Sequence, residues 1–127
     1  SGHLFGPHQL SDGTLRAMAI IALLLQPPED LPGLIVLDEP EIGLHPYAVE
    51  ILAGLIQSAS VFRPVIVATQ SPLLVNHFRA EDVITVTRER SESRFRRQNA
   101  ESLAVWLEEY SMGEIWERNL IGGNPSR

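Results

Sequence analysis

Leu34-Ile35-Val36-Leu37-Asp38-Glu39-Pro40 runs from four apolar residues directly into two carboxylates and a proline. An apolar run without polar alternation predicts a strand that is buried on both faces. Open α/β folds bind their ligands at the carboxyl edge of the sheet, and such a strand would deliver Asp38 and Glu39 to that edge. Two adjacent carboxylates there indicate a site that holds a divalent cation and a phosphate chain.

The residues that follow predict a second strand, parallel to the first. Pro46 suits the first position of a helix over 47–59, and Pro64 opens another apolar run over 65–69. Two buried strands joined by a helix over about 30 residues form a βαβ unit, whose strands are parallel. We therefore expect an α/β fold in which both strands end at the same edge of the sheet.

Further elements are predicted on both sides of this unit, within a single domain over 1–127. Ser11 precedes a helix over 15–26 that is apolar over most of its surface, so this helix is expected to be buried on more than one side. The later elements are a short helix, two hairpin strands and two tail helices, predicted over 73–78, 83–88, 93–98, 100–110 and from 111 onward.

Composition limits the possible classes of protein. A chain of 127 residues with 44% hydrophobic and 20% charged residues has the profile of a globular domain with one core. Its longest apolar run has nine residues, from Ala17 to Leu25, which is too short to span a membrane. The absence of cysteine excludes disulfides and favours a cytoplasmic location. A net charge of -6 argues against a generally basic surface for nucleic acid.

Asp38 and Glu39 are expected to have different roles, because adjacent strand residues point to opposite faces. Asp38 would hold Mg²⁺, directly or through water, and Glu39 would orient or deprotonate a water molecule. The alternative is a plain surface turn after a core strand. On these two residues alone, both interpretations are equally supported.

Leu10-Ser11-Asp12-Gly13-Thr14 lies at the start of the first predicted helix. Exposed backbone N–H groups and the helix dipole favour an anion there. Gly13 would let a phosphate approach the backbone, and the Ser11 hydroxyl would be a further donor. In isolation, however, the segment is better explained as an ordinary helix cap.

Gln70 follows the second predicted strand, at the same sheet edge as Asp38 and Glu39. Its amide both donates and accepts hydrogen bonds, as a group that senses a γ-phosphate must. A strand-to-helix turn needs no function, so this signal is weak alone.

Taken in order along the chain, these segments resemble the motifs of ABC-type ATPases. More narrowly, they resemble the AAA-labelled ATPases related to RecF, SMC proteins and overcoming-lysogenization-defect nucleases. The resemblance covers residues 9–78 by motif, and the tail within 79–127 resembles the end of predicted ATPases of this group. The implied motifs are the signature (Leu10–Thr14), the Walker B pair (Asp38 and Glu39), the D-loop (Gly43–Pro46) and the switch (Gln70).

The resemblance implies ATP and Mg²⁺ as cofactors and an ATP-dependent homodimer. In this family one protomer supplies Walker A, Walker B and the switch, and the other supplies the signature motif. Asp38 would then serve Mg²⁺, while Glu39 and Gln70 would serve catalysis on this chain's own nucleotide. The residues implied to contact the partner's nucleotide or to lie at the dimer seam are Ser11, Gly13, Thr14 and His45.

Two features depart from the family pattern. The chain has no G-x-x-x-x-G-K-[ST] motif and no lysine, so the Walker A phosphate cradle is missing. The sequence therefore looks like the C-terminal part of a P-loop NTPase fold, expected to work with an N-terminal P-loop part of the same parent and to be inactive alone. The switch position commonly holds histidine, whereas Gln70 cannot titrate near neutrality.

Other interpretations remain open at this point. One is a degenerate ATPase lobe that binds protein or DNA without hydrolysis. Another is a flavodoxin-like domain that binds Mg²⁺ through Asp38, Glu39 and Glu41. The segment 88–97 holds five of the ten arginines, and nucleic acid is a possible partner there; a solvated hairpin with intermixed glutamates is the favoured interpretation.

Overall fold

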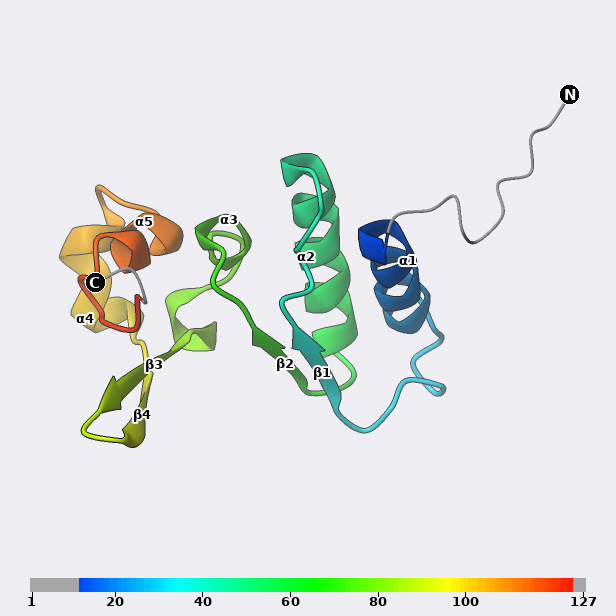
Figure 1. Cartoon of the computed structure of the whole chain (residues 1–127), viewed down its shortest axis with the longest axis horizontal. Helices are drawn as coiled ribbons and strands as arrows, with labels where there is room; N and C mark the ends of the chain where they lie inside the picture. Colours follow the sequence, from blue (N-terminus) through cyan, green and yellow to red (C-terminus); the bar gives the residue numbers. More distant parts are fainter. Residues whose placement is uncertain (1–11, 125–127) are drawn as a thin grey trace, which may run out of the picture. The chain divides into compact units, whose positions relative to one another are not determined.

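The computed structural model describes residues 12–124 and divides into two units, one ending at Thr69 and the other beginning at Gln70. The elements of the first unit are α1 (Asp12–Leu24), β1 (Ile35–Asp38), α2 (Pro46–Ser60) and β2 (Val65–Ala68) (Figure 1). Those of the second are α3 (Pro72–Val75), the 3₁₀ helix η2 (Ala80–Asp82), β3 (Ile84–Glu89), β4 (Glu92–Arg97), α4 (Ala100–Leu107) and α5 (Met112–Glu117). The predicted α/β class is confirmed.

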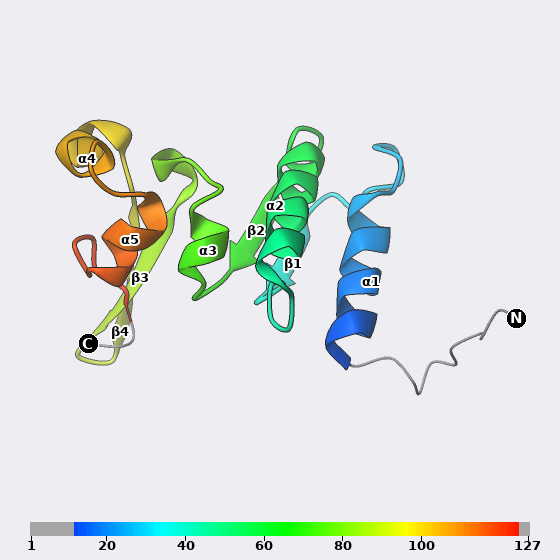
Figure 2. The ribbon, with the colours of Figure 1, turned by 90° about the horizontal axis from the view of Figure 1, so that it is seen from above.

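The predicted parallel pair is also confirmed. β1 and β2 are paired in parallel, with Ile35 opposite Val65 and Asp38 opposite Ala68. Helix α2 connects them and lies along one face of the pair (Figure 2). Its buried side chains are Val49, Leu52, Ala53, Ile56 and Ala59.

The expectation that β1 is buried on both faces is wrong. Ile35 and Leu37 are buried, but Val36 between them is 62% exposed, and its partner on β2, Ile66, is 56% exposed. The expectation for α1 is also wrong, since Leu24 is the buried residue of that helix and Met18 is exposed. An apolar run shows that both faces suit a core, but burial also requires a second covering layer.

Polar side chains cap the starts of α2, α3 and α5. The ring of His45 caps α2, accepting a hydrogen bond at Nδ1 from the Tyr47 N–H at 3.2 Å. Ser71 caps α3 in the same way, through the Leu74 N–H. Ser111 begins α5 with a capping box, which it forms with Glu114. These polar residues satisfy helix N–H groups that have no partner within the helix, and so they fix where each helix begins.

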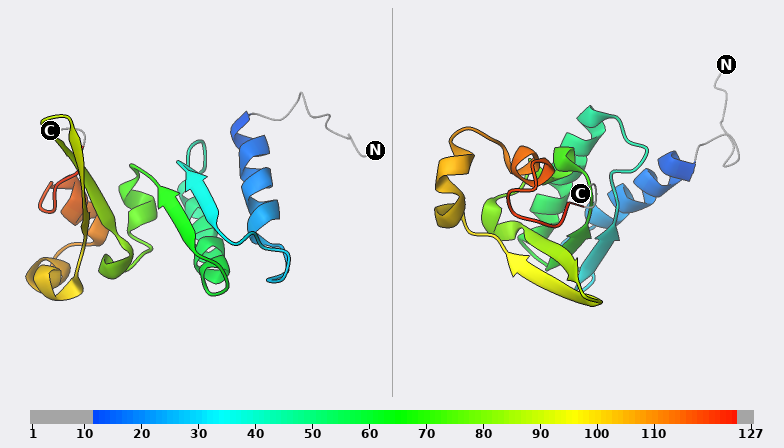
Figure 3. Two further views of the ribbon diagram at one scale, coloured as in Figure 1. Left: turned by 90° about the horizontal axis from the view of Figure 1, so that it is seen from below. Right: turned by 60° about the vertical axis from the view of Figure 1, so that its left-hand side comes forward.

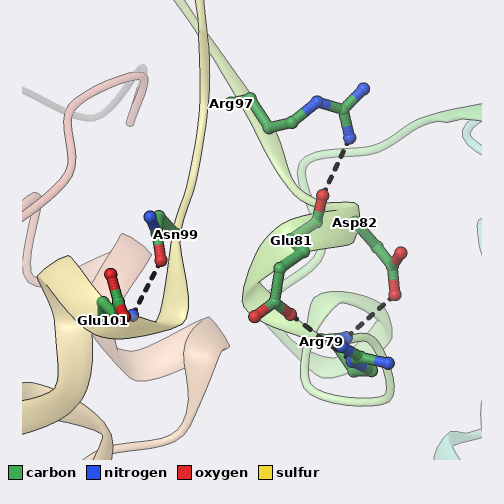
Figure 4. Close-up of polar contacts among 6 residues, drawn as sticks. All are labelled: Arg79, Glu81, Asp82, Arg97, Asn99 and Glu101. Carbon is green, nitrogen blue, oxygen red and sulfur yellow. Dashed lines mark hydrogen bonds and ion pairs between the residues drawn. The ribbon is translucent and has the colours of Figure 1, made fainter.

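The second unit has its own core, in which Ala80, Leu103, Met112 and Ile115 are buried together. The predicted hairpin is confirmed as β3 and β4, whereas η2 was not predicted. Its entry is fixed by the Arg79 N–H, which donates to Asp82 (Figure 4). Trp106 of α4 is 42% exposed, and its ring lies beside that of Tyr110.

Among residues 12–124, no helix is long and apolar enough to cross a membrane.

Candidate functional site

The end of β1 departs from a regular strand at the predicted catalytic residue. Glu39 has φ 46°, in the left-handed region, and its N–H donates to the Ala68 carbonyl at 2.7 Å. The sequence predicted that Asp38 and Glu39 are successive residues of one strand. The structure shows instead that the strand ends at Asp38 and that Glu39 begins the turn. A non-glycine residue in this region costs roughly 1 kcal/mol or more, and such residues concentrate at functional sites.

Asp38 ends β1 and is exposed, so its carboxylate is accessible at the strand end. Its backbone carbonyl accepts a hydrogen bond from the Arg16 guanidinium of α1. Sequence reasoning missed Arg16, although one signal was available: it is the only basic residue of α1, in a helix that is otherwise mostly apolar. Arg16 thus joins the helix of the predicted signature motif to the end of the strand that carries the predicted Walker B pair.

The turn after β1 lies close to the start of α1. Gly43 has φ 80°, and a Cβ built on it would lie 3.7 Å from the Gly13 Cα. The Leu44 N–H donates to the Glu41 carbonyl at 3.0 Å and helps to close this turn. The fold of the first unit thus brings together residues of the predicted signature and D-loop motifs that are 30 positions apart in the chain.

Glu41 connects this turn to the end of β2. Its Oε1 accepts a hydrogen bond from the Thr69 hydroxyl. Its Oε2 is buried and has no hydrogen-bond partner among the described residues. A buried carboxylate oxygen without a partner is costly, so this atom marks a place where a cation or a donor would be stabilising.

The remaining predicted residues are placed as follows. Ser11 lies outside the described residues. Thr14 is exposed in the first turn of α1, and His45 is exposed while its Nδ1 caps α2. Gln70 is exposed and is the first residue of the second unit, two positions after the end of β2. That Gln70 shares an edge with Asp38 stays a prediction.

The donor set fits a magnesium ion only in part. Within residues 12–124, no three His, Asp or Glu side chains are grouped so that they can hold a metal ion. This finding gives no support to a self-contained site of Asp38, Glu39 and Glu41. Mg²⁺ is, however, commonly bound through one or two carboxylates, with phosphate and water completing its ligands. Asp38 suits that arrangement, since it is exposed at the strand end.

A cleft in the first unit is apolar and does not suit a nucleotide phosphate. Its lining comes from α1, the turn after β1 and α2, namely Ala17, Ile20, Ile21, Pro40, Leu44, Ala48, Ile51 and Leu52. A phosphate requires donors or cations, which these side chains do not supply.

The fold resembles that of P-loop ATPases. A solved structure from work on the ATP-driven dimerization and DNA-stimulated activation of SMC ATPases matches with a TM-score of 0.61 and 20% sequence identity. The match covers 80% of this chain and 62% of that one, so this chain spans less than two thirds of its length. This likeness establishes the α/β fold of the SMC ATPase domain.

Residues 1–76 match the family model described as "AAA domain, putative AbiEii toxin, Type IV TA system". The chain therefore belongs to this AAA family. No curated protein matches the chain. The matched range includes the segments that carry the predicted signature, Walker B, D-loop and switch residues.

Proposed function

We propose that this chain supplies the Walker B, signature and switch motifs of an ATP-hydrolysing enzyme whose P-loop lies in another part of the same parent protein. The observation that carries this proposal is the conformation of Glu39. It holds a strained left-handed backbone directly after Asp38, anchored by the Ala68 carbonyl at the end of the parallel pair. A surface turn without function would favour glycine or asparagine at this position.

Exposed apolar surfaces on the first unit support the proposal that a further part of the parent protein packs against it. Leu34, Val36 and Ile66 are each more than half exposed around the β1–β2 pair. Met18 on α1 is 55% exposed. Contiguous apolar surface of this kind marks a contact with further protein. We infer that the P-loop part covers it, which would also bury β1 on both faces, as the sequence predicted.

In the proposed mechanism, Mg²⁺ supplies charge neutralisation for the phosphates of ATP. Asp38 would hold the ion from the strand end. The Glu39 carboxylate would orient the attacking water and accept its proton. The Gln70 amide would hydrogen-bond to the γ-phosphate, which needs a donor but no titratable group.

The proposed homodimer would use the surface where Gly13 and Gly43 meet. Both glycines present backbone without a side chain, and His45 is exposed two residues beyond Gly43. A two-fold axis through such a surface would make it self-complementary, so that each copy offers its signature segment to the nucleotide of the other. On this proposal, turnover would depend steeply on protein concentration.

The test is Glu39→Gln in the parent protein that carries both the P-loop and this chain. Loss of the general base should lower kcat by about 10²–10⁴-fold, while binding of a fluorescent ATP analogue stays unchanged. Glu50→Gln is a matched control, because Glu50 is exposed on α2. Normal hydrolysis by the Glu39→Gln protein would show that Glu39 is not the base. ATP binding without any hydrolysis by the wild type would favour the degenerate binding module.

A further inference from the structure

The β3–β4 hairpin has one covered face and one open face. Directly opposite residues of an antiparallel pair share a face. Thr85 and Thr87 belong to the covered face, since a Cβ built on Gly123 would lie 3.3 Å from Thr85 Cβ and one on Gly122 would lie 3.2 Å from Thr87 Cγ2. Thr85 is 6% exposed. We call the other face the Phe95 face; its residues are Ile84, Val86, Arg88, Ser93, Phe95 and Arg97.

The Phe95 face is apolar at its centre and exposed. Phe95 is 71% exposed, and Ile84 and Val86 are each 46% exposed. Phe95 and Val86 are paired in the register, so their side chains are neighbours. Scattered apolar residues are ordinary on a protein surface, but three that share one face of a two-stranded sheet form a patch.

The hairpin that carries this patch is positively charged. Residues 84–97 contain five arginines and two glutamates, a net charge of +3 in a chain whose total is -6. Within the described part of the chain, the ion pair of the hairpin joins Arg94 to Glu89, both on the covered face. Arg88 and Arg97, on the Phe95 face, have no described carboxylate partner. The sequence analysis expected arginines and glutamates to be intermixed in this hairpin. It did not predict that the glutamates lie on the covered face, apart from Arg88 and Arg97.

The two arginines of the Phe95 face lie at opposite ends of it. Arg97 is paired with Ile84 and Arg88 with Ser93, four strand positions apart, or about 13 Å. Arg97 is held in place by the bond from its Nη1 to the Glu81 carbonyl, at 2.8 Å (Figure 4). The turn of the hairpin lies away from α4 and α5 (Figure 3). The exposed fractions of Ile84, Val86 and Phe95 show that this face is accessible within the second unit.

We propose that the Phe95 face binds single-stranded nucleic acid, with a base stacked on the Phe95 ring and backbone phosphates held by Arg88 and Arg97. The net positive charge of the hairpin in an acidic chain selects a polyanion. An exposed ring on a sheet surface suits the faces of unpaired bases, which a duplex hides. An acidic peptide would satisfy the arginines but would leave the ring without a planar partner.

The test uses the full chain without ATP and measures fluorescence anisotropy of a labelled oligothymidylate. The single strand should bind more tightly than a duplex of equal length. Phe95→Ala should weaken binding about tenfold, since base stacking on an aromatic side chain contributes about 1–3 kcal/mol. Phe62→Ala is the matched control, because Phe62 is 54% exposed in the first unit. It should bind like the wild type.

A salt titration tests the phosphate contacts separately. Arg88→Gln should reduce the slope of log K against log salt by about 0.7, the value expected for one lost contact to a single strand. Arg79→Gln, whose side chain is 81% exposed outside the hairpin, should leave the slope unchanged. The proposal is overturned by equal affinity for the duplex, by a wild-type affinity of Phe95→Ala, or by polyglutamate that competes as well as the oligonucleotide. Because no ATP is present, none of these outcomes depends on the proposed ATPase function.

Discussion

Gly113→Ala should strongly destabilise the second unit, because α5 approaches α3 there more closely than a side chain allows. A Cβ built on Gly113 would lie 2.4 Å from the Pro72 carbonyl oxygen, 2.9 Å from its carbon and 2.5 Å from Asn76 Oδ1. Asn76 can rotate away only by losing the bond that its Oδ1 accepts from the Gly113 N–H at 2.6 Å. The Pro72 carbonyl is backbone, so relieving that contact requires α3 itself to move.

The expected cost follows from these two contacts. Overpacking costs about 1–3 kcal/mol, and the lost hydrogen bond about 1 kcal/mol more. The higher helix propensity of alanine offsets less than about 1 kcal/mol. The free energy of unfolding should therefore fall by about 1–4 kcal/mol. Since α3 begins directly after Gln70 and Ser71, the same substitution should also displace the proposed switch residue.

Urea denaturation followed by tryptophan fluorescence measures this effect. Trp106 and Trp116 are the two tryptophans of the chain and both lie in the second unit, so their signal reports on that unit. Gly54→Ala is the matched control: a Cβ built on Gly54 has no atom within 4 Å, and the substitution should stabilise α2 without lowering the tryptophan midpoint. The reasoning is refuted if Gly113→Ala unfolds within about 0.5 kcal/mol of the wild type.

Three further predictions concern single residues. Glu39→Gly should unfold at higher urea than Glu39→Ala, by about 1 kcal/mol measured by circular dichroism, because only glycine relieves the left-handed strain. Hydrogen bonds from the Ser111 N–H and hydroxyl lower the pKa of Glu114 below its ordinary 4.5. The stability that Glu114 contributes is thus present above pH 4.5 and is lost as the pH falls below that value. Thermal unfolding measured over a series of pH values should show this loss in the wild type and not in Glu114→Gln. Arg16→Met should lower the free energy of unfolding of the first unit by about 1 kcal/mol in urea, because the Asp38 carbonyl loses its donor.

Local signals in the sequence predicted the elements well, because each is decided within a few residues. Pro46 after His45, and Pro72 after Ser71, fix helix starts through chemistry confined to one turn. Burial was predicted poorly for the opposite reason. Whether Val36 is covered depends on a layer of protein that its own strand does not contain, and the apolar run carries no information about where that layer comes from.

The candidate site was singled out from the sequence, but its connections were not. Asp38 and Glu39 were chosen because two carboxylates after an apolar strand are conspicuous in a sequence, and their roles stay predictions. Arg16 and Glu41 were not assigned their contacts, since a hydrogen bond to the Asp38 carbonyl or to the Thr69 hydroxyl depends on packing between distant segments. The left-handed backbone of Glu39 could not be predicted either, because glutamate has no intrinsic preference for it.

The charges at the strand end explain why nucleotide binding should depend on the proposed P-loop part. Asp38, Glu39 and Glu41 place three carboxylates around the turn after β1, while the Arg16 contact described there is with a backbone carbonyl. ATP is itself a polyanion, so these residues repel its phosphates unless cations intervene. We propose that the P-loop part supplies cations that offset this repulsion. The P-loop part and ATP must then strengthen each other's binding to this chain, since coupling between two ligands is reciprocal. ATP should then tighten the association of the P-loop part with this chain, and Asp38→Asn should weaken that coupling by removing the carboxylate proposed to bind Mg²⁺.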